Sequence, residues 1–316
     1  MGIPDGPGDQ ERSHVDDQGA EDPFLAHRPL LFTIAYEMLG SATDAEDVLQ
    51  ESYLRWRAVD RAEVGHPRAY LVRVVTRQAL NHLRAARARR EEYVGTWLPE
   101  PIRTAPEVSE DVVLAESVSM AVLLVLETLG PAERAVFLLH DVFGYTHPEI
   151  AATIGKNEVT VRQIAHRARR HVRARRRRFE PDSAAAREII QRFLRAAATG
   201  EVQALMDLLA PDVVQISDGG GKVPAARRPI VGRDEVARFV LGVARTGAAD
   251  APVEHVTCNG MPAARFLAGG EPDWLLAFEI RDGRISGLYG IRNPDKLHRA
   301  DTVRALDRGG LRPWKP

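Results

Sequence analysis

The sequence contains one cysteine, Cys258, among 316 residues. A single thiol cannot build an intramolecular disulfide framework or a zinc site with several cysteine ligands. Long apolar runs are also missing, because the stretch 120–126 with its neighbours falls far short of the roughly 20 residues that cross a bilayer. These absences predict a protein of a reducing compartment without a membrane segment, and we expect neither a metal site nor a cofactor.

A secretory signal is missing as well. Such a signal needs a basic start followed by an apolar run, whereas residues 1–21 are acidic, rich in glycine and proline, and without hydrophobic periodicity. This composition is typical of a disordered arm. Together with the missing membrane segment, it predicts a cytoplasmic protein.

The formal net charge of −1 hides blocks of opposite sign. Nearly all of the 43 basic residues are arginines, and many of them crowd into the segments 84–90 and 159–179, where no acidic residue occurs. The segment 44–51 is acidic instead. Separated blocks of charge indicate at least two surfaces that meet different partners.

Hydrophobic periodicity divides the chain into a helical half and a mixed half. Apolar residues at three- and four-residue spacing predict helices from about residue 23 to 90 and from 112 to 178. After residue 184, helices precede strand-like runs, and Asp282-Gly283 between the last two runs is a strong hairpin signal. The fold class is therefore multidomain, with two all-α domains followed by an α+β domain. The expected parts are a disordered acidic arm (1–21), a first helical domain (22–94), a linker (95–110), a second helical domain (111–179), the α+β domain (184–302) and a tail (303–316).

The linker has an unusual composition. Its prolines and weak periodicity argue against a regular element, yet it contains two large apolar residues, Trp97 and Leu98. Burying a side chain such as Leu98 contributes about 1.5–3 kcal/mol. We therefore expect these residues to dock on a neighbouring domain and to set the spacing between the helical domains.

The stretch 145–173 has the pattern of a helix-turn-helix. Thr146 and Glu149 have the spacing of a capping box, Gly155 suits the tight turn, and Asn157 can cap the second helix. The apolar face of that helix leaves a polar face pointing outward: Arg162, Gln163, His166, Arg167 and Arg170. Such side chains contact base edges and phosphates in the major groove. A basic solvated helix is the alternative, and the capped helix and glycine turn before it favour DNA binding.

Two groups of segments resemble a known family. Residues 149–155, with Thr160–Gln163 and the following His-Arg-Ala-Arg, resemble region four of the bacterial extracytoplasmic-function sigma factors. Residues 44–52, 66–71 and 81–84 resemble region two of the same family. The two matches follow the order and the spacing of the family and cover roughly residues 23–178. The resemblance implies two sigma-factor domains and an alternative sigma factor that directs RNA polymerase to specific promoters.

The resemblance also implies a partner for each charged surface. An acidic helix would dock on RNA polymerase core enzyme through Asp44, Glu46, Asp47, Gln50 and Glu51. The next helix would contact promoter DNA at the minus-ten element through Arg77, Asn81, Arg84 and Arg87. The polar face of the helix-turn-helix would read the minus-thirty-five element. An ordinary solvated helix face is the alternative for each residue alone, and Gln78 and Asn81 depart from the common asparagine and aspartate, which leaves the base preference open.

The C-terminal part resembles the SnoaL-like, NTF2-like cone domain that a subgroup of these sigma factors carries. Three motifs mark the subgroup, and they occur here at Trp97–Pro101, Asp218–Lys222 and Asn293–Leu297. The resemblance implies that this domain fastens to the sigma domains and regulates their activity in cis. The implied interdomain residues are Trp97, Leu98, Asp218, Gly219, Gly220, Gly221, Lys222, Asn293, Pro294, Asp295, Lys296 and Leu297.

Catalysis is not expected. The candidates in the C-terminal part show no defensible spacing of an acid–base site; they are Asp212, Asp218, His255, Asp273 and Tyr289. The glycine loop fails the P-loop pattern because Val223 stands where serine or threonine is required. A small ligand in the pocket of the cone domain stays possible. The alternatives are a DNA-binding regulator whose pocket is an enzyme or ligand sensor and, less favoured, a simple dimeric repressor.

Overall fold

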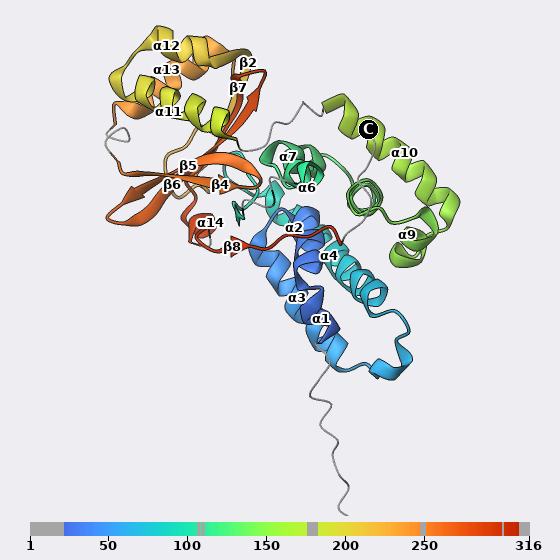
Figure 1. Ribbon diagram of the computed structural model, residues 1–316. Coiled ribbons are helices and arrows are strands. Elements are labelled where there is room, and N and C mark those ends of the chain that lie inside the picture. The colour runs from blue at the N-terminus through green and yellow to red at the C-terminus, as the bar shows by residue number, and fades with distance from the viewer. Residues whose placement is uncertain are drawn as a thin grey trace, which may run out of the picture.

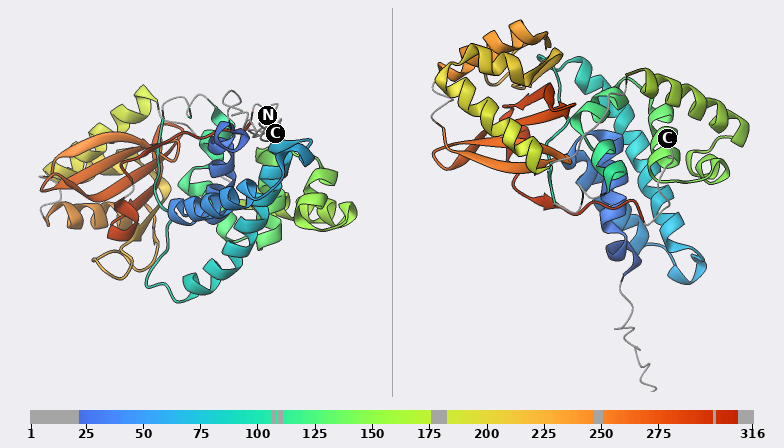
Figure 2. Two further views of the ribbon diagram at one scale, coloured as in Figure 1. Left: turned by 90° about the horizontal axis from the view of Figure 1, so that it is seen from below. Right: turned by 45° about the horizontal axis from the view of Figure 1, so that its top comes forward.

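The computed structural model describes residues 22–105, 108, 111–175, 183–246, 251–298 and 300–309, and the side chains of 87–91 and 175 fall outside this description. The acidic arm expected at 1–21 also lies outside the described residues. Figure 1 shows the helical N-terminal parts on one side and a sheet covered by helices on the other. Figure 2 shows from two further directions that these two bodies lie side by side.

Residues 22–91 form the first helical domain. Its elements are α1 (Pro23–Ala26), α2 (Arg28–Leu39), α3 (Ala42–Arg57), the 3₁₀ turn η1 (Arg61–Glu63) and α4 (Pro67–Glu91). Gly40 ends α2 in the left-handed conformation, and the Ser41 hydroxyl starts α3 by accepting the Asp44 amide at 3.0 Å. These two residues turn α3 back along α2, so that both helices bury their apolar faces against α4.

The second helical domain follows the linker. Its elements are α6 (Val112–Ser117), α7 (Met120–Glu127), α8 (Pro131–Phe137), the π-helical turn η2 (Leu138–Val142), α9 (His147–Ile154) and α10 (Glu158–Arg175). The predicted capping box is present, because the Thr146 amide donates to Glu149 Oε2 at 2.8 Å. Gly155 closes α9 with a positive φ of 69°. The helix-turn-helix predicted from these residues is confirmed.

The two helical domains share one hydrophobic core. Apolar side chains of α2, α3 and α4 belong to the same buried cluster as those of α7, α8, α9 and α10. Helix α4 lies at the boundary and contacts both α8 and α9. The described structure therefore packs the two domains against each other directly.

The C-terminal domain is the expected α+β unit. Its elements are α11 (Ala184–Thr199), α12 (Val202–Leu208), β2 (Leu209–Asp218), β3 (Ile230–Val231), α13 (Arg233–Ala244), β4 (Val253–Cys258), β5 (Met261–Ala268), β6 (Glu271–Arg281), β7 (Arg284–Ile291), α14 (Pro294–Leu297) and β8 (Val303–Arg304). The predicted hairpin joins β6 to β7, with Asp282 and Gly283 at positive φ of 52° and 70°. Strand β2 directly follows α12, because Leu209 already pairs with Ile285 of β7.

The sheet extends beyond the C-terminal domain. Eight strands of the described chain form one sheet in the order β3-β2-β7-β6-β5-β4-β1-β8. Strand β1 (Arg103–Thr104) comes from the expected linker and pairs antiparallel with β4, and β8 from the expected tail pairs parallel with β1. Linker and tail are thus joined to the sheet edge by backbone hydrogen bonds.

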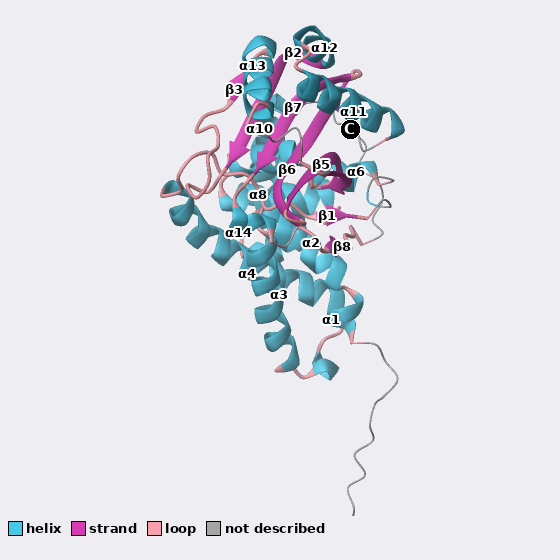
Figure 3. Ribbon diagram, turned by 90° about the vertical axis from the view of Figure 1, so that its left-hand side faces the viewer, coloured by secondary structure: helices cyan, strands magenta, loops and turns pink. Residues whose placement is uncertain are grey.

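Both faces of the sheet are covered, as Figure 3 shows. Along β6, Leu276 and Phe278 pack beneath α11, α12 and α13, whereas Leu275 and Ala277 point to the opposite face. This alternation follows from the two-residue period of a strand. The opposite face packs on Leu98 of the linker and on α7, so the sheet forms the boundary with the helical domains.

Candidate functional surfaces

Helix α10 presents the expected DNA-contacting residues to solvent. Its apolar residues Val161, Ile164 and Ala168 are buried, and the helical period leaves the polar set on the opposite face. All of the predicted residues there are exposed: Arg162, Gln163, His166, Arg167 and Arg170. Arg169 differs, because its Nε donates to Asp141 at 2.7 Å and ties α10 to η2. The exposed set forms a basic face of the kind that contacts phosphates and base edges.

The residues expected to bind core polymerase share one side of α3. Asp47, Gln50 and Glu51 are exposed, and Asp44 and Glu46 are half-buried. The buried residues of the helix lie on the other side and pack into the shared core. We refer to this set as the acidic face of α3.

The C-terminal tail covers part of the acidic face. Glu46 pairs with Arg304 of β8, and the guanidinium carbon of Arg304 lies 5.1 Å from the centroid of the Phe32 ring. After β8 the chain continues along α2, where the Asp307 amide donates to Thr33 Oγ1 at 3.1 Å. The tail therefore occupies a residue that the sequence assigns to core polymerase.

On α4, the residues expected at the minus-ten element are in different surroundings. Arg77 contacts protein, because its Nε donates to the Thr153 carbonyl at 2.7 Å and its Nη2 to the Ala152 carbonyl at 3.1 Å. These carbonyls lie at the C-terminal end of α9, where a helix leaves carbonyl groups without helical partners. Asn81 and Arg84 are exposed, with Arg84 Nη1 donating to Asn81 Oδ1 at 3.2 Å.

Two other residues of α4 turn toward α3. Gln78 Nε2 donates to Glu51 Oε2 at 2.6 Å, and His82 Nε2 lies 3.2 Å from Glu51 Oε1. Gln78, which departs from the family pattern, thus connects α4 to the acidic face of α3. The side chain of Arg87, also expected at the minus-ten element, lies outside the described residues.

A buried carboxyl group, Glu37, lies where the two helical domains meet. Ser117 Oγ donates to Glu37 Oε1 at 2.6 Å, and Arg134 Nε donates to the Glu37 backbone carbonyl at 2.9 Å. Burial raises the pKa of Glu37 to about 8, and the Ser117 hydrogen bond and the charges of Arg134 and Arg308 oppose this rise only in part. Most of this carboxyl is therefore protonated at neutral pH.

The linker docks on the C-terminal domain through Leu98. This side chain is fully buried among residues of β4 to β7 and Met120 of α7. Its amide donates to Asp218 Oδ2 at 2.9 Å, and Lys296 Nζ donates to its carbonyl. The linker motif and the two C-terminal motifs, which are far apart in the sequence, therefore meet at one place, which we call the linker dock.

Asp218 is buried at the centre of the linker dock. Its Oδ2 accepts from Lys296 Nζ at 2.7 Å, and its Oδ1 accepts from the Tyr93 hydroxyl at 2.6 Å and the Gly220 amide at 2.9 Å. The Lys296 ammonium lies 5.1 and 4.5 Å from the ring centroids of Tyr93 and Trp97. Burial, followed by the hydrogen bond and charge of Asp218, raises the pKa of Tyr93 well above its ordinary value. Tyr93 therefore stays protonated and keeps donating.

The glycines of the loop allow close approach. A Cβ on Gly220 would lie 2.5 Å from Cγ of Asn293, and one on Gly221 would lie 2.9 Å from Cβ of Val94. Both glycines have positive φ, which side chains rarely tolerate. Asn293 uses the contact to donate from Nδ2 to the Tyr93 hydroxyl at 2.8 Å.

The remaining motif residues flank the linker dock. Lys222 and Asp295 form an ion pair at 2.5 Å, and because both are exposed it contributes little to stability. Pro294 occupies the first turn of α14, and Leu297 is buried in the same cluster as the linker leucine. A Cβ on Gly219 would overlap the backbone of its own loop. All twelve predicted interdomain residues thus lie at or beside the dock.

Glu100 attaches the same linker to the first helical domain. Its Oε1 accepts from Ser41 Oγ at 3.0 Å, and its Oε2 accepts from the Thr43 amide at 2.9 Å. Its backbone carbonyl accepts from the Tyr36 hydroxyl at 2.7 Å, and its amide donates to the Gly40 carbonyl at 2.9 Å. Glu100 therefore caps the start of α3 and fixes the linker on its second side.

The turn between β4 and β5, Asn259-Gly260, enters the junction of the three domains, and sequence reasoning missed it. Asn259 Nδ2 donates to the Tyr36 hydroxyl at 2.6 Å and to the Val118 carbonyl at 2.8 Å. Its Oδ1 accepts from the Ile102 amide at 3.1 Å. An Asn-Gly pair between two strand-like runs is a strong hairpin signal, so the sequence could have revealed the turn but not its contacts.

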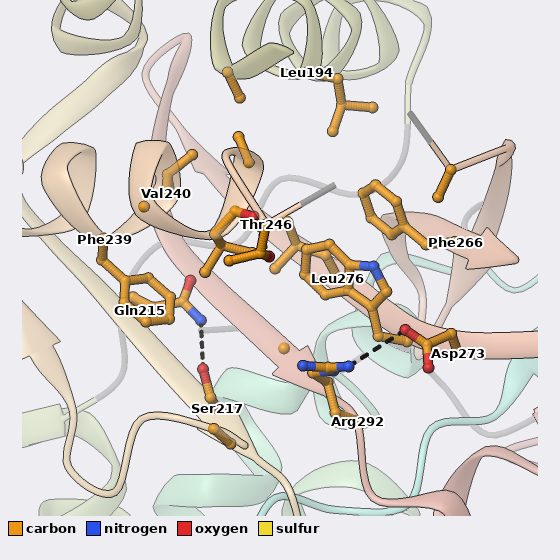
Figure 4. A pocket seen from close by; sticks show the side chains of 18 of the residues that line it. Leu194, Gln215, Ser217, Phe239, Val240, Thr246, Phe266, Asp273, Leu276 and Arg292 are labelled. Carbon is orange, nitrogen blue, oxygen red and sulfur yellow. Dashed lines mark hydrogen bonds and ion pairs between the residues drawn. The ribbon is translucent and has the colours of Figure 1, made fainter. Parts of the chain in front are cut away.

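The C-terminal domain also contains a cavity of about 760 Å³ between α11, α13 and the sheet. Figure 4 shows the side chains that line it, most of them apolar. The ionisable residues of the lining are Asp273 and Arg292, whose side chains pair at 3.4 Å. Among the described lining residues, one carboxylate paired with arginine favours ligand binding over acid–base chemistry.

The other residues considered for catalysis lie elsewhere. Asp212 pairs with Arg281 at 3.0 Å, and His255 is exposed on β4. Tyr289 donates to Glu279 Oε2 at 2.6 Å, and neither residue lines the cavity. The structure therefore does not bring these side chains together with Asp218 or Asp273.

The described residues offer neither a metal-binding cluster nor a membrane-spanning helix. Within the described ranges, no group of three histidine, cysteine, aspartate or glutamate side chains could hold a metal ion. No helix in the same part of the chain has the length and apolar character to span a membrane. The Cys258 thiol is buried, and burial raises its pKa to about 12, which keeps it unreactive.

Comparison with known proteins identifies three segments. Residues 24–89 match Sigma-70 region 2, residues 119–172 match Sigma-70 region 4, and residues 190–287 match the SnoaL-like domain. The chain is 38% identical over 287 residues to the ECF RNA polymerase sigma factor SigJ of Mycobacterium tuberculosis. This match covers 87% of this chain and 92% of the relative. It is 32% identical over 291 residues to the probable ECF RNA polymerase sigma factor SigI of the same species, over 91% of this chain and 97% of the relative. The crystal structure of SigJ superposes with a TM-score of 0.72 at 36% identity, over 88% of this chain and 98% of that one.

Proposed function

Because the chain belongs to the extracytoplasmic-function (ECF) family of RNA polymerase sigma factors, we propose that its C-terminal domain regulates promoter recognition by holding regions 2 and 4 together. RNA polymerase core enzyme and promoter DNA are the partners of such a factor. Region 2 lies in the first helical domain, region 4 in the second, and a SnoaL-like extension follows. Polymerisation belongs to the core enzyme, and no catalytic step is assigned to this chain.

Each charged surface receives one of these partners. The acidic face of α3 binds core polymerase, Asn81, Arg84 and Arg87 of α4 contact the minus-ten element, and the basic face of α10 reads the minus-thirty-five element. Exposure of Asp47, Gln50 and the α10 set supports these roles. Charge complementarity would orient the encounter with polymerase and DNA and speed it.

The observation that carries the proposal is the contact of Arg77 with α9. It joins the minus-ten helix to the helix-turn-helix at hydrogen-bond distance, 2.7 Å from Arg77 Nε to the Thr153 carbonyl. The two promoter elements lie roughly 25 base pairs apart, or about 85 Å at ~3.4 Å per pair. Helices that share one core cannot contact both elements at once. Regions 2 and 4 must therefore separate, and Arg77 then becomes available to DNA.

The C-terminal domain opposes this separation. Asn259 binds Tyr36 of region 2 and Val118 beside region 4 with one amide group. The linker between the regions is fixed by Asp218 on one side and by its own Glu100 on the other. Opening the sigma domains thus requires release of the linker and of the β4–β5 turn, which gives the extension its control in cis.

Run-off transcription tests this proposal. With core enzyme and a promoter selected from a library by the wild-type chain, Asn259→Ala should raise transcript yield several-fold, because two buried hydrogen bonds that favour the closed arrangement are lost. Asp282→Ala is the matched control, since Asp282 has a similar positive φ but is exposed in the β6–β7 turn. Yield from Asn259→Ala equal to or below that of the control would refute closure by the extension.

A second role belongs to the cavity, which we propose takes a small ligand. Its volume of about 760 Å³ and its mainly apolar lining support this role.

A further inference from the structure

The cavity of the C-terminal domain has the shape and lining of a small-molecule site. Its walls come from α11, α13 and the concave face of the sheet, and the apolar side chains include Phe193, Leu194, Phe239, Val240 and Leu276 (Figure 4). At one wall the rings of Phe266 and Trp274 stack, with centroids 4.0 Å apart. Cavities of roughly 300–1,000 Å³ with apolar walls and a few polar groups are typical of ligand sites. The bulk of an occupant must therefore be apolar.

One polar group of the lining lacks a partner. Arg292 Nη1 donates to the Pro224 carbonyl at 3.3 Å and Nη2 to Asp273 at 3.4 Å, both long contacts. Its Nε is buried and has no hydrogen-bond partner in the described structure. A buried donor without an acceptor destabilises the site, and an oxygen atom of a ligand would remove that cost by accepting from it.

The charge around Arg292 selects the kind of oxygen. Asp273 already balances the guanidinium, so a second carboxylate would be repelled by the first. A carbonyl or hydroxyl oxygen accepts from the Arg292 guanidinium without that repulsion, and it reaches the buried Nε when the side chain turns toward the cavity. Farther along the wall, Gln215 Nε2 donates to Ser217 Oγ at 3.0 Å, and the Ser217 hydroxyl still has a proton for a second acceptor.

We propose that this cavity binds an uncharged, mainly apolar molecule with a carbonyl or hydroxyl oxygen held by Arg292, and that its occupancy alters the linker dock. The second half rests on the proposed regulation in cis, whereas the first half does not.

Arg292 links the cavity to the dock. Its amide donates to the Asp218 backbone carbonyl at 2.8 Å, and its side chain holds Pro224. Residues 224–226 separate the cavity from a second hollow of about 310 Å³, whose other wall is formed by linker residues 94–96. Ser217, next to Asp218, lines both spaces. A ligand that draws Arg292 toward its oxygen therefore acts on the loop and strand that hold the linker.

Nile red, an uncharged polycyclic dye with a carbonyl group, serves as the probe for binding to the full chain. We expect saturable one-to-one fluorescence enhancement, and about tenfold weaker binding by Val240→Trp, which fills the cavity from α13. Arg238→Trp is the control, since residue 238 is exposed on the same helix. Ala197→Trp fills the cavity from α11 and replaces Val240→Trp if that variant does not keep the wild-type melting temperature.

The polar half of the recognition has its own variant. Arg292→Leu should weaken Nile red binding several-fold, and the anionic dye anilinonaphthalene sulfonate should bind the wild type more weakly than Nile red does. Unsaturable binding, or equal binding by the wild type and both cavity-filling variants, would overturn the site. Stronger binding of the anionic dye would overturn the preference for an uncharged ligand.

Amide exchange of Leu98, whose N–H donates to Asp218, tests the coupling. Saturating Nile red should change its exchange rate several-fold in the wild type and not in Arg292→Leu. Saturable binding with unchanged Leu98 exchange would refute the coupling while leaving the binding site in place. Run-off transcription with Asn259→Ala tests closure by the extension in the absence of any ligand. The proposed regulation in cis and the proposed ligand site can therefore be refuted independently.

Discussion

Asp218 and Lys296 form a buried ion pair, and both side chains make further contacts with neighbouring groups. The carboxylate accepts from Lys296, Tyr93, the Leu98 amide and the Gly220 amide, and the ammonium faces two aromatic rings. Removing one partner of a buried pair typically costs about 3–5 kcal/mol, because the other charge is left without compensation. The pair therefore specifies where the linker binds, and a misplaced linker would leave both charges unsatisfied.

Glu37 gives the junction of the helical domains a dependence on pH. Its pKa is raised to about 8 in the folded chain, above the ordinary value of 4.5. Between these two values the folded state binds a proton that the unfolded state has released, so stability falls as pH rises from about 4.5 to 8. Glu37→Gln removes this proton uptake, so the free energy of unfolding of that variant should decline less with pH. A fully buried carboxyl can make the decline as steep as about 1.4 kcal/mol per pH unit.

Urea unfolding at several pH values between 5 and 8.5 measures this effect. The wild-type free energy of unfolding should decrease relative to that of Glu37→Gln across the range, and the difference should level off above pH 8. A difference between the two chains that is constant with pH would contradict a raised pKa at Glu37.

At the scale of elements, α4 carries two contacts that oppose its expected use. Gln78 and His82 contact Glu51 of α3, and Arg77 caps α9. The three side chains belong to the helix that the sequence assigns to the minus-ten element. Gln78 and His82 are held within the first helical domain, whereas the Arg77 contact joins the two domains, so the closed arrangement withdraws Arg77 from its proposed contact with DNA.

Helix α10 is the element whose role can be tested most simply. Replacing Arg162, Gln163 and Arg167 with alanine should lower promoter-specific initiation by about 100-fold or more, because each good base contact contributes about 1–3 kcal/mol. Binding to core polymerase should be unchanged, since the acidic face of α3 is untouched.

A matched triple variant on another helix controls for the loss of charge. Gln191, Arg192 and Arg195 are exposed on α11, and their replacement with alanine removes the same side-chain types. Run-off transcription and a core-binding assay compare the two variants with the wild type. Loss of core binding in the α10 variant, or equal initiation by both variants, would show that α10 has been misassigned.

Local signals in the sequence were sufficient for these elements. The capping box at Thr146, the left-handed turn at Gly155 and the Asp282-Gly283 hairpin all depend on neighbouring residues, and the structure contains each of them. Boundaries were harder where pairing decides them: β1 and β8 are two-residue strands that exist because the sheet edge accepts them. No local pattern could predict such strands.

At the scale of the whole molecule, the contacts between domains were the part that the sequence could not supply. Motif resemblance assigned Trp97, Asp218 and Lys296 to one interdomain group, and the structure brings them into contact. The Asn259–Tyr36 contact joins residues 223 positions apart in the sequence and carries no motif. Its energy depends on the way three domains meet, which periodicity and spacing do not encode.

The same contacts make the free chain a closed form of a sigma factor. The linker is fixed on both sides, the β4–β5 turn lies between the regions, and the tail covers Glu46 on the acidic face. Each contact involves the C-terminal domain or the segments joined to its sheet. Under the proposed regulation, promoter recognition displaces contacts that the extension provides.

The distance between α3 and α10 tests this account most directly. Leu54 and Val159 are exposed on these helices beside the surfaces assigned to partners, so the labelled chain must first be shown to initiate transcription like the wild type; the buried Cys258 will not compete for dyes. In the Leu54→Cys, Val159→Cys double variant, energy transfer between two attached dyes should be high in the free chain. Transfer should fall strongly when core enzyme and promoter are added. Low transfer in the free chain, or high transfer that persists in a transcribing complex, would contradict the closed arrangement.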